Sequence, residues 1–393
     1  MHIAIISDCN VEYLKKYLAP KFKSIKAING GAPSVTNTIE GFLSLGHQVT
    51  VFKLSSLIEQ KVILQGELLT IVLIPYKANK FLKFFAHSFI AAPIIRKEIR
   101  NSIHQFDYIH AQWSYENILA ISYLRKKQPI FCTPRDWASY IFKISSLKNK
   151  LMWINKYIVA EYIYSLNNIH YIANSPYTQS LIQKRTKQTN IPIIPNPIND
   201  SFLVEKREFY PERPVLLSIL TSYDKRKNCD TLLVAFNLLL KTYPDAQLHL
   251  VGTPYTEENP VMNTLKKQGL LKNVILHGSI PHNKIKELML NSSMLIHPST
   301  EETFGNTLIE AMGCKLPVIG GKNSGAVPYV LNHGICGILC DILSPNDICN
   351  SIIKLMDSKT RNQYINRGYN YVKEHYTQKS VALQHIEFYK SIR

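Results

Sequence analysis

A proline-rich segment near the middle of the chain separates two long stretches in which apolar runs alternate with helical patterns. Residues 191–200 read Ile-Pro-Ile-Ile-Pro-Asn-Pro-Ile-Asn-Asp, with three prolines in ten residues. Such a segment cannot be a helix interior, because each proline removes a backbone donor and clashes with the preceding turn. We interpret it as a last strand that runs into an interdomain hinge. The length of 393 residues and the 46% apolar content suit two α/β domains with separate cores.

The alternation on each side of this segment predicts parallel sheets covered by helices on both faces. In the first half we expect a helix over residues 35–45 and strands at 3–7, 48–53, 69–74, 108–110, 129–133 and 169–173. In the second half we expect strands at 215–219, 247–251, 273–277, 294–297 and 317–320. The helices expected there cover 229–242, 261–268, 283–291 and 306–313, and one or two more cover 361–393. The predicted fold class is therefore α/β, with two doubly wound sheets.

One segment of the second half indicates chemistry. Residues 299–318 read STEETFGNTLIEAMGCKLPV and place Glu302 and Glu310 eight positions apart, where a short apolar strand meets a helix. A helix N-terminus attracts anions through its free N–H groups and its dipole, and Gly305 lets a ligand approach the backbone. We expect Thr300 or Thr303 to cap this helix. On spacing alone, a capping acid and a solvated helix acid explain the same pattern.

This segment resembles the signature of the retaining glycosyltransferases of family 4, which have the GT-B fold and read roughly E-x-F-G-x-x-x-x-E-A-M-A-x-G-x-P-V-I. The matching positions also include Ala311-Met312, Gly313 and Pro317-Val318-Ile319. The resemblance implies that Glu302 contacts the donor-sugar hydroxyls and that Glu310 holds the nucleotide ribose. Donor contacts are also expected from the residues between the two acids, namely Phe304, Gly305, Asn306 and Thr307.

The resemblance also implies a domain organisation. Two Rossmann-like domains would face a central cleft, with the acceptor bound by residues 1–198 and the nucleotide-sugar donor by residues 199–375. Residues 376–393 would form a helix that packs back on the first domain.

A basic loop after the strand at 215–219 is the expected diphosphate site. It places Lys225, Arg226 and Lys227 just before a helix, where their charge adds to the helix dipole. In family 4 this loop usually reads G-R-x-x-x-x-K-G, and Lys227-Asn228 align with the K-G pair. The arginine of that pattern is absent, and we expect Arg226 to replace it. A solvated basic loop is the alternative interpretation.

Two glycine-containing segments complete the expected donor site. Gly30 and Gly31 open the first long helix, where family 4 enzymes place a G-G loop against the donor phosphates and the acceptor. Gly278 and Ile280 resemble the segment that receives the nucleobase by main-chain contacts. The fingerprint G-x-G-x-x-G is missing, which disfavours a nicotinamide dehydrogenase.

The first half supplies further candidates at strand ends. After the strand at 129–133, family members commonly carry T-x-H-G or T-x-H-D, and this chain has Arg135 in place of the histidine, followed by a matching Asp136. A guanidinium stays protonated and cannot act as a base, so we expect Arg135 to contact a phosphate or hydroxyl. His110 and Gln112 are expected on the acceptor or sugar side, although a lone histidine is more often structural.

Positive charge is concentrated in the first half. The net charge is +18, and residues 1–200 carry 24 Lys/Arg against 11 Asp/Glu. Nucleic acid, an anionic membrane surface or a phosphorylated acceptor would suit this charge, but the basic residues form no motif that reads nucleic acid. Residues 80–89 and 147–164 combine lysines with apolar side chains, as membrane-surface helices do. Ordinary helices packed on a sheet explain these two segments as well.

Several patterns that the sequence lacks bear on its cofactors and on its location in the cell. No D-x-D motif lies near the expected site, so we expect neither a metal nor a cofactor beyond a UDP- or GDP-linked sugar. The seven single cysteines fit neither a disulfide framework nor a zinc site, and no apolar run reaches the roughly 18 residues of a membrane span. With no basic leader, we expect a cytoplasmic protein, peripheral on the inner face of the cell membrane.

The resemblance therefore implies a retaining transferase that moves a hexose-type sugar from a nucleotide-diphosphate sugar to a saccharide or lipid-linked acceptor, in cell-surface polysaccharide biosynthesis. No carboxylate is placed for double displacement, so the resemblance implies front-face attack, with the leaving phosphate deprotonating the acceptor. Two alternatives stay open: a nucleotide-sugar 2-epimerase, and a non-catalytic basic scaffold derived from a transferase.

Overall fold

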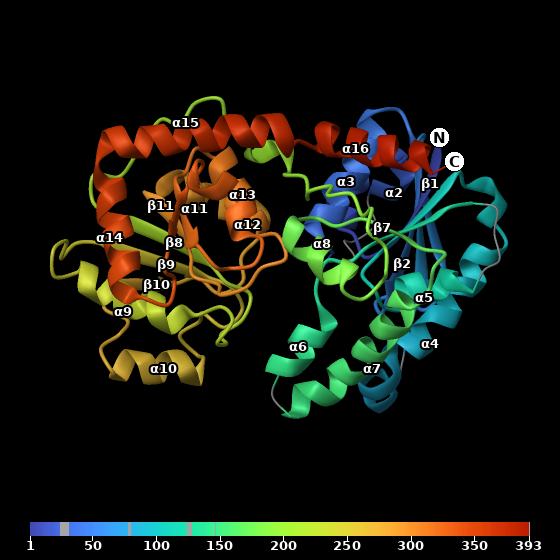
Figure 1. The fold of residues 1–393 in the computed structure, drawn as a ribbon, viewed down its shortest axis with the longest axis horizontal. Coiled ribbons are helices and arrows are strands. Elements are labelled where there is room, and N and C mark those ends of the chain that lie inside the picture. The colour runs from blue at the N-terminus through green and yellow to red at the C-terminus, as the bar shows by residue number, and fades with distance from the viewer. Residues whose placement is uncertain (24–30, 78–79, 124–127, 146, 393) are drawn as a thin grey trace. The chain divides into compact units, whose positions relative to one another are not determined.

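The protein divides into two compact units, each with its own sheet (Figure 1). The computed structural model describes residues 1–23, 31–77, 80–123, 128–145 and 147–392. Unit 1 comprises Met1–Pro197 and Gln378–Arg393, and unit 2 comprises Ile198–Thr377.

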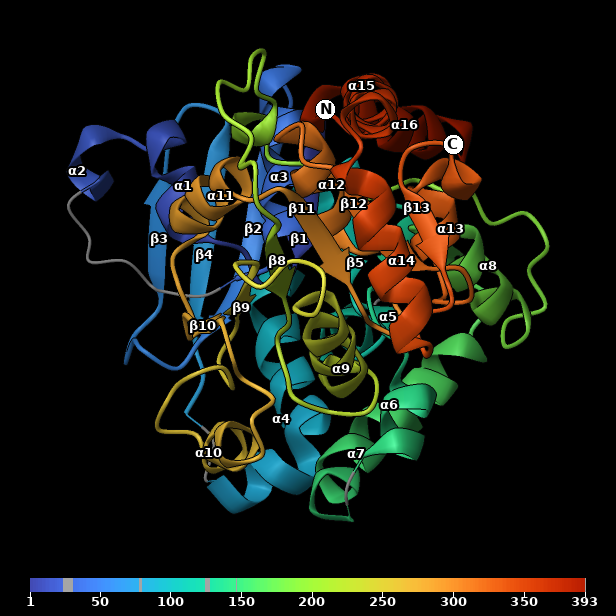
Figure 2. The ribbon, with the colours of Figure 1, turned by 90° about the vertical axis from the view of Figure 1, so that its left-hand side faces the viewer.

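Unit 1 is built on a seven-stranded sheet with the order β3-β4-β2-β1-β5-β6-β7, most of which can be followed in Figure 2. Its strands are β1 (His2–Ile6), β2 (Gln48–Ser55), β3 (Val62–Gln65), β4 (Leu69–Pro75), β5 (Tyr108–Gln112), β6 (Ile130–Thr133) and β7 (His170–Tyr171). All pairings are parallel except that of β3 with β4. The six predicted strands are confirmed, with ends shifted by a few residues. The short edge strand β3 was not predicted.

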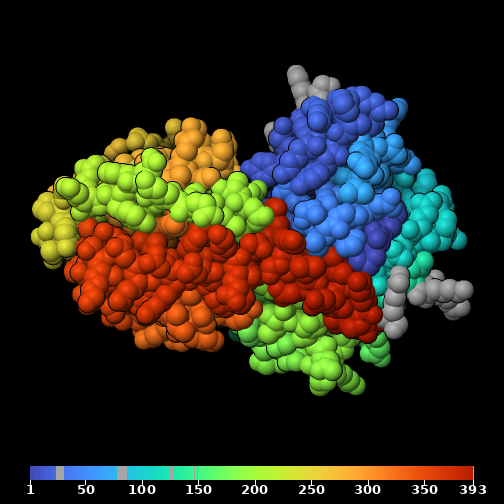
Figure 3. Space-filling view, turned by 90° about the horizontal axis from the view of Figure 1, so that it is seen from above, coloured from blue at the N-terminus to red at the C-terminus, as the bar shows by residue number. Residues whose placement is uncertain are grey.

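Helices cover both faces of this sheet and enclose two cores. The helices of unit 1 are α1 (Val11–Leu14), α2 (Pro20–Lys23), α3 (Pro33–Ser44), α4 (Lys80–Arg100), α5 (Glu116–Ser122), α6 (Ala138–Ile144), α7 (Leu147–Tyr164), α8 (Pro176–Gln183) and α16 (Gln378–Ser391). One core packs α4, α5 and α7 on the sheet, and the other packs α3 and α16. Figure 3 shows the C-terminal helix, in the deepest red, lying against the blue N-terminal part of unit 1.

The proline-rich segment does not form the predicted last strand. Among the described residues, its one sheet contact is a parallel bridge between Ala173 and Ile193, with Ala173 N–H donating to Pro192 O and Ile194 N–H donating to Ala173 O. The prolines at 192, 195 and 197 have no N–H to continue the ladder. The boundary between the two units follows directly, at Pro197 and Ile198.

Unit 2 contains a six-stranded, all-parallel sheet with the order β10-β9-β8-β11-β12-β13. Its strands are β8 (Val215–Ile219), β9 (Gln247–Val251), β10 (Val274–Leu276), β11 (Met294–His297), β12 (Val318–Gly321) and β13 (Ile338–Cys340). Its helices are α9 (Cys229–Leu239), α10 (Pro260–Lys267), α11 (His282–Asn291), α12 (Asn306–Gly313), α13 (Val327–Val330), α14 (Pro345–Met356) and α15 (Ser358–His375). The predicted elements are confirmed, while β13, α13 and α14 were not predicted.

The strand order places a topological switch point beside β8. The chain passes from β8 outward through β9 and β10, then returns to the other side of β8 with β11. The loops that follow β8 and β11 therefore leave the sheet at the position where open α/β sheets bind ligands.

Among the residues that the structure describes, no helix combines the length and the apolar character needed to cross a bilayer.

Candidate functional site

The residues predicted for donor chemistry in unit 2 converge on one carboxylate. Lys227 ends the loop after β8, and its Nζ lies 2.5 Å from Oε1 of Glu302, in the loop after β11. Nε2 of His297, at the end of β11, lies 3.3 Å from the same oxygen. Nη1 of Arg226 lies 3.9 Å from it. Two loops separated by about seventy residues thus meet at the switch point.

Asn228 and Thr300 hold these two loops together. Thr300 donates from its N–H and its Oγ1 to Arg226 O, at 2.8 and 3.2 Å. Asn228 occupies the glycine position of the family's K-G pair and has a φ of +52°, a left-handed conformation that asparagine tolerates better than most residues. Its Nδ2 donates to Pro298 O and Ile342 O, at 3.2 and 2.8 Å. Asn228 therefore keeps the backbone shape that a glycine would have and ties the ends of β8, β11 and β13 together.

Gly325, which was not predicted from the sequence, packs directly against the backbone of Glu302. It lies in the loop after β12 with a φ of +60°, and a Cβ built on it would lie 2.4 Å from Glu302 O. The neighbouring Ala326 N–H donates to the same carbonyl, at 2.9 Å. A glycine shortly after a predicted strand was the available signal.

The Glu302 side chain is a buried but ionised carboxylate. Burial raises its pKa, but the charge of Lys227 and the adjacent His297 outweigh burial and hold the pKa well below its usual range. The site thus offers a strong hydrogen-bond acceptor, suited to sugar hydroxyls, beside two cations that suit phosphate.

The helix α12 begins differently from the prediction. Its N-cap is Gly305, with a φ of +99° and no side-chain cap, so neither Thr300 nor Thr303 occupies the capping position. Phe304 is buried against Tyr376, with ring centroids 5.7 Å apart, so only its backbone is available to a ligand. Asn306 and Thr307 form the first turn, and Thr307 Oγ1 lies 3.3 Å from His297 Nδ1. The backbone of this turn is the anion-binding element predicted from the motif.

Glu310 lies on α12, and His282, which was not predicted, is its partner. Nε2 of His282, at the start of α11, lies 2.9 Å from Glu310 Oε1. Burial lowers the pKa of His282, but the hydrogen bond and charge of Glu310 outweigh burial and raise it overall. Since His282 follows Ile280 by two residues, this pair joins the expected ribose acid to the expected nucleobase segment.

The nucleobase segment is anchored through Gly278. Its N–H donates to Tyr255 O at 2.7 Å, and its carbonyl accepts from Gly252 N at 2.8 Å. Ile280 is partly buried against the core below α12. Contacts to a base would therefore come from the backbone between Gly278 and α11.

Lys225 is exposed on the basic loop.

Arg135 lies in unit 1, within a polar network. Its Nε donates to Gln112 Oε1 at 2.7 Å, and its Nη1 donates to Ser34 Oγ and Asn196 Oδ1 at 3.0 and 2.6 Å. Burial lowers its pKa to about 10, although Tyr389 opposes the change, so the guanidinium stays charged at neutral pH.

His110 and Gln112, which we expected on the acceptor or sugar side, lie inside unit 1. Both side chains are 0% exposed. The His110 ring nitrogens lie 2.7 Å from Tyr389 Oη and 2.8 Å from Thr133 Oγ1. Burial, with the charges of His385 and Arg135, lowers the pKa of His110 well below its ordinary value. The two residues thus support Arg135 from within the core.

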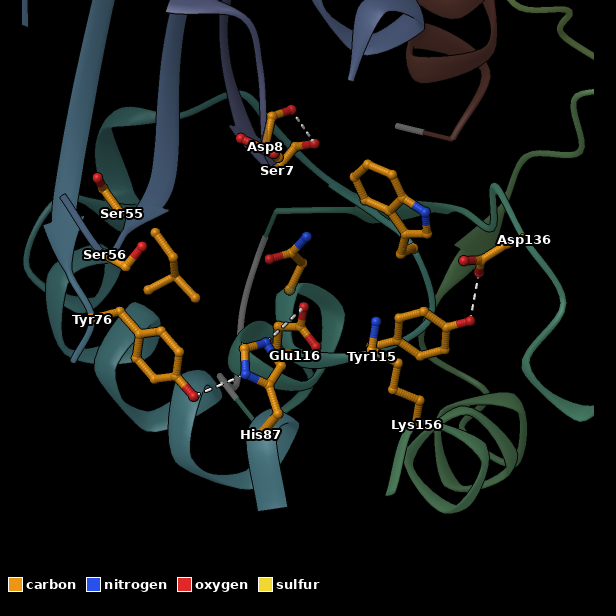
Figure 4. A pocket seen from close by; sticks show the side chains of 13 residues that line it. Ser7, Asp8, Ser55, Ser56, Tyr76, His87, Tyr115, Glu116, Asp136 and Lys156 are labelled. Atoms are coloured by element: carbon orange, nitrogen blue, oxygen red, sulfur yellow. Dashed lines mark hydrogen bonds and ion pairs between the residues drawn. The ribbon is translucent and has the colours of Figure 1, made fainter. Parts of the chain in front are cut away.

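A cavity of about 330 Å³ opens at the carboxyl ends of the strands of unit 1 (Figure 4). It includes the predicted Asp136, whose Oδ1 accepts from Tyr115 Oη at 2.5 Å. Asp8, His87, Glu116 and Lys156 also line it. Burial raises the pKa of Glu116, but hydrogen bonding to His87 and the charge of Lys156 lower it overall, to about 2. The sequence analysis missed these four residues.

The cavity also contains Trp113, which has a φ of +63°. A bulky residue in the left-handed region is uncommon, and such strain often accompanies a functional site.

Gly31 lies against the loop after β1, since a Cβ built on it would lie 2.2 Å from the Cys9 carbonyl carbon. Gly30 lies outside the described residues.

Among the residues described, no three or more His, Cys, Asp or Glu side chains are grouped to hold a metal ion.

Comparison with known sequences assigns both halves of the chain. The model of Glycosyltransferase Family 4 matches residues 28–202, and that of Glycosyl transferases group 1 matches residues 201–371. N-acetyl-alpha-D-glucosaminyl L-malate synthase from Bacillus anthracis is 26% identical over 189 residues, 48% of each chain. An uncharacterized glycosyltransferase from Haemophilus influenzae is 32% identical over 166 residues, 42% of this chain and 44% of the other. The chain thus spans about half the length of these relatives.

Comparison with solved structures supports the same fold. Sucrose-phosphate synthase from Thermosynechococcus elongatus has a TM-score of 0.76 and 18% identity, with 100% of this chain and 99% of that chain covered. Anabaena HepE in complex with UDP-glucose has a TM-score of 0.66 and 17% identity, with both chains fully covered at 100%. WaaG, a glycosyltransferase involved in lipopolysaccharide biosynthesis, has a TM-score of 0.69 and 15% identity, with 98% and 99% covered. The chain therefore belongs to glycosyltransferase family 4, the glycosyl transferases group 1, and has the GT-B fold of two Rossmann-like domains.

Proposed function

We propose that the protein transfers a hexose-type sugar from a nucleotide-diphosphate sugar to a hydroxyl of a saccharide or lipid-linked acceptor, with retention, in cell-surface polysaccharide assembly. The observation that carries this proposal is the convergence of Arg226, Lys227 and Glu302 at the switch point of unit 2. The HepE complex with UDP-glucose supports a UDP-linked donor, and the role of WaaG supports the pathway.

In this proposal the donor diphosphate is bound by cations and backbone together. Lys227 and Arg226 supply charge beside Glu302, and the first turn of α12, at Asn306 and Thr307, supplies N–H groups. The exposed Lys225 adds long-range attraction.

The remaining parts of the donor use the two acids. Glu302 accepts hydrogen bonds from hydroxyls of the donor sugar, and its low pKa keeps it ionised for this role. Glu310, positioned by His282, accepts from the ribose hydroxyls. The nucleobase lies along the backbone beside Ile280.

The proposed reaction is a front-face displacement. The bond between the anomeric carbon and the diphosphate oxygen breaks, and a bond from the acceptor oxygen to that carbon forms on the same face. The acceptor proton moves to the departing diphosphate, whose negative charge Lys227 and Arg226 stabilise. Arg135, which donates to Gln112, Ser34 and Asn196, contacts a donor phosphate or an acceptor hydroxyl.

The acceptor is proposed to enter the cavity of unit 1. Asp8, Glu116 and Asp136 offer carboxylate oxygens for hydroxyl groups, and Trp113 offers an aromatic face. Such a lining suits a saccharide ring.

The test is a binding and turnover screen of UDP-, GDP- and other nucleotide-sugars with the wild type and Glu310→Ala. We expect saturable binding of one donor, weakened about 10- to 100-fold by the loss of a charge-assisted hydrogen bond. Glu257→Ala, at an exposed acid of the same unit, is the matched control and should bind like the wild type. Free epimers formed without an acceptor would indicate an epimerase, and the absence of any donor binding would indicate a non-catalytic scaffold.

A further inference from the structure

A row of exposed apolar side chains runs along α7 and is called the α7 stripe here. It consists of Leu147, Leu151, Ile154, Ile158 and Tyr162. Their spacing of three or four residues keeps them on one face of the helix. Leu147 is 81% exposed and Ile158 is 51% exposed. Scattered exposed apolar residues are ordinary, but a continuous row on one helix indicates an interaction surface.

The opposite face of the C-terminal half of α7 is packed in the core of unit 1, which fixes the direction that the stripe faces. Val159, Ala160 and Ile163 are buried in the core with α4 and α5. Asn155 Oδ1 accepts from Ser88 N–H at 3.2 Å, which ties α7 to α4. The spacing of the buried residues places them on the side of the helix away from the stripe.

The neighbouring α6 extends the same surface. Phe142 of α6 stacks on Tyr157 of α7, with ring centroids 5.5 Å apart, and Ile144 is exposed at the end of α6. Figure 1 shows the two helices beside each other at one end of unit 1.

Charge around the stripe identifies the kind of partner. Residues 137–160 contain no acidic residue and four lysines, Lys143, Lys148, Lys150 and Lys156. The acid that follows, Glu161, is paired with Arg185 at 3.1 Å. Apolar side chains flanked by lysines are typical of helices that lie in the interface of an anionic bilayer. A second copy of this chain would bring the same lysines together, and like charges oppose such a contact.

The stripe is also linked to the cavity of unit 1. Lys156 of α7 lines that cavity (Figure 4), and its Nζ lies 4.9 Å from the ring centroid of Tyr115. One helix therefore forms both a cavity wall and the exposed apolar surface.

We propose that the α6–α7 surface docks unit 1 on an anionic lipid bilayer, so that the cavity receives an acceptor anchored in that bilayer. The docking is independent of the proposed function, while the role of the cavity rests on it. Residues 80–89 were the other membrane candidate in the sequence, and the side chains of 80–85 lie outside the described part of the chain.

The experiment is sedimentation of the full chain with two kinds of vesicle. One contains phosphatidylglycerol and phosphatidylcholine in equal parts, and the other contains phosphatidylcholine alone. We expect binding to the anionic vesicles that weakens as salt is raised. The variant Leu147→Ser/Leu151→Ser/Ile158→Ser should bind about tenfold more weakly or worse, because it removes the apolar anchor.

Two further variants separate charge from apolar burial. Lys143→Gln/Lys150→Gln should lose about fivefold in affinity per lysine for the anionic vesicles. Phe209→Ser/Val261→Ser removes two exposed apolar side chains of unit 2 and should bind like the wild type. Circular dichroism spectra and thermal unfolding transitions like those of the wild type show that all variants are folded.

The proposal is overturned if the wild type does not prefer anionic vesicles, or if the stripe variant binds them as well as the wild type does. It is also overturned if light scattering shows a dimer that only the stripe variant dissociates. Donor binding without vesicle binding would remove the docking and leave the proposed function intact. Vesicle binding without any donor binding would leave the docking intact and remove the proposed function.

Discussion

At the scale of single residues, the proposed donor site depends on how its charges are paired. Glu302 is buried, yet Lys227 and His297 keep it ionised, so its oxygens are available as acceptors at neutral pH. The sequence motif identified the two acids and the lysine, because their spacing in the chain reflects the loops that carry them. It did not identify His297 or His282, since a histidine's partner is set by the fold and not by its neighbours in sequence.

Replacing Lys227 tests this pairing. We expect Lys227→Met to lower kcat/KM about 10²- to 10³-fold, because the leaving diphosphate loses its nearest cation and Glu302 loses the charge that lowers its pKa. Lys225→Met, at the exposed lysine of the same loop, should change kcat/KM only a few-fold. Equal effects of the two substitutions in steady-state assays would contradict the assigned roles.

The cavity acid Glu116 predicts a pH dependence of stability. Its folded-state pKa of about 2 lies below the ordinary value of 4.5, so its ionised form stabilises the fold. This stabilisation is fully present above the ordinary value and is lost as the pH falls toward 2, with a maximum of about 3 kcal/mol. Thermal unfolding followed between neutral pH and about pH 3 should show a shallower decline for Glu116→Gln than for the wild type. Parallel declines would show that Glu116 is not stabilised in this way.

At the scale of elements, strand ends position the site, and the sequence predicted most of these ends. Apolar runs such as those of β9 and β11 were long enough to be recognised. The strands β3 and β13 are short and lie at sheet edges, where fewer side chains are buried. The proline-rich segment lies at the end of unit 1, and the strand predicted there is reduced to one bridge. The cavity was missed because its residues come from helices and loops that only the folded chain brings together.

Gly325 tests whether the loop after β12 positions Glu302. Gly325→Ala introduces both backbone strain and a clash with Glu302 O, so kcat/KM should fall at least about tenfold. Gly269→Ala is the control, because its φ of +75° gives similar strain while nothing lies within 4 Å of the added Cβ. The control should lose about 1 kcal/mol of stability and keep its activity. Equal loss of activity in both variants would assign the effect to strain alone.

At the scale of the whole molecule, the chain leaves unit 1 at Pro197 and returns to it at Gln378. The returning helix α16 is part of the core of unit 1, where Val381, Ala382, Ile386 and Tyr389 are buried with α3. Tyr389 also reaches His110, below Arg135. The last sixteen residues of the chain therefore complete a core that the first half began.

Because α16 returns to the core of unit 1, a substitution in this C-terminal helix should destabilise unit 1 and not unit 2. Ile386→Ser replaces a side chain that is 5% exposed and should destabilise unit 1 by about 2–4 kcal/mol. Leu383→Ser, at a position of the same helix that is 41% exposed, should have little effect. Hydrogen exchange should show faster opening of β1 and α3 with unit 2 unchanged, and faster exchange confined to unit 2 would contradict the assignment.

The central claim is retaining sugar transfer at the site built around Glu302 and Lys227. The most direct measurement incubates the enzyme with the nucleotide-sugar that it binds and a saccharide acceptor, and follows the anomeric proton of the product by NMR. The account predicts release of the nucleoside diphosphate, a product with the anomeric configuration of the donor, and loss of both in Lys227→Met. A product of inverted configuration, or turnover that Lys227→Met leaves unchanged, would contradict it.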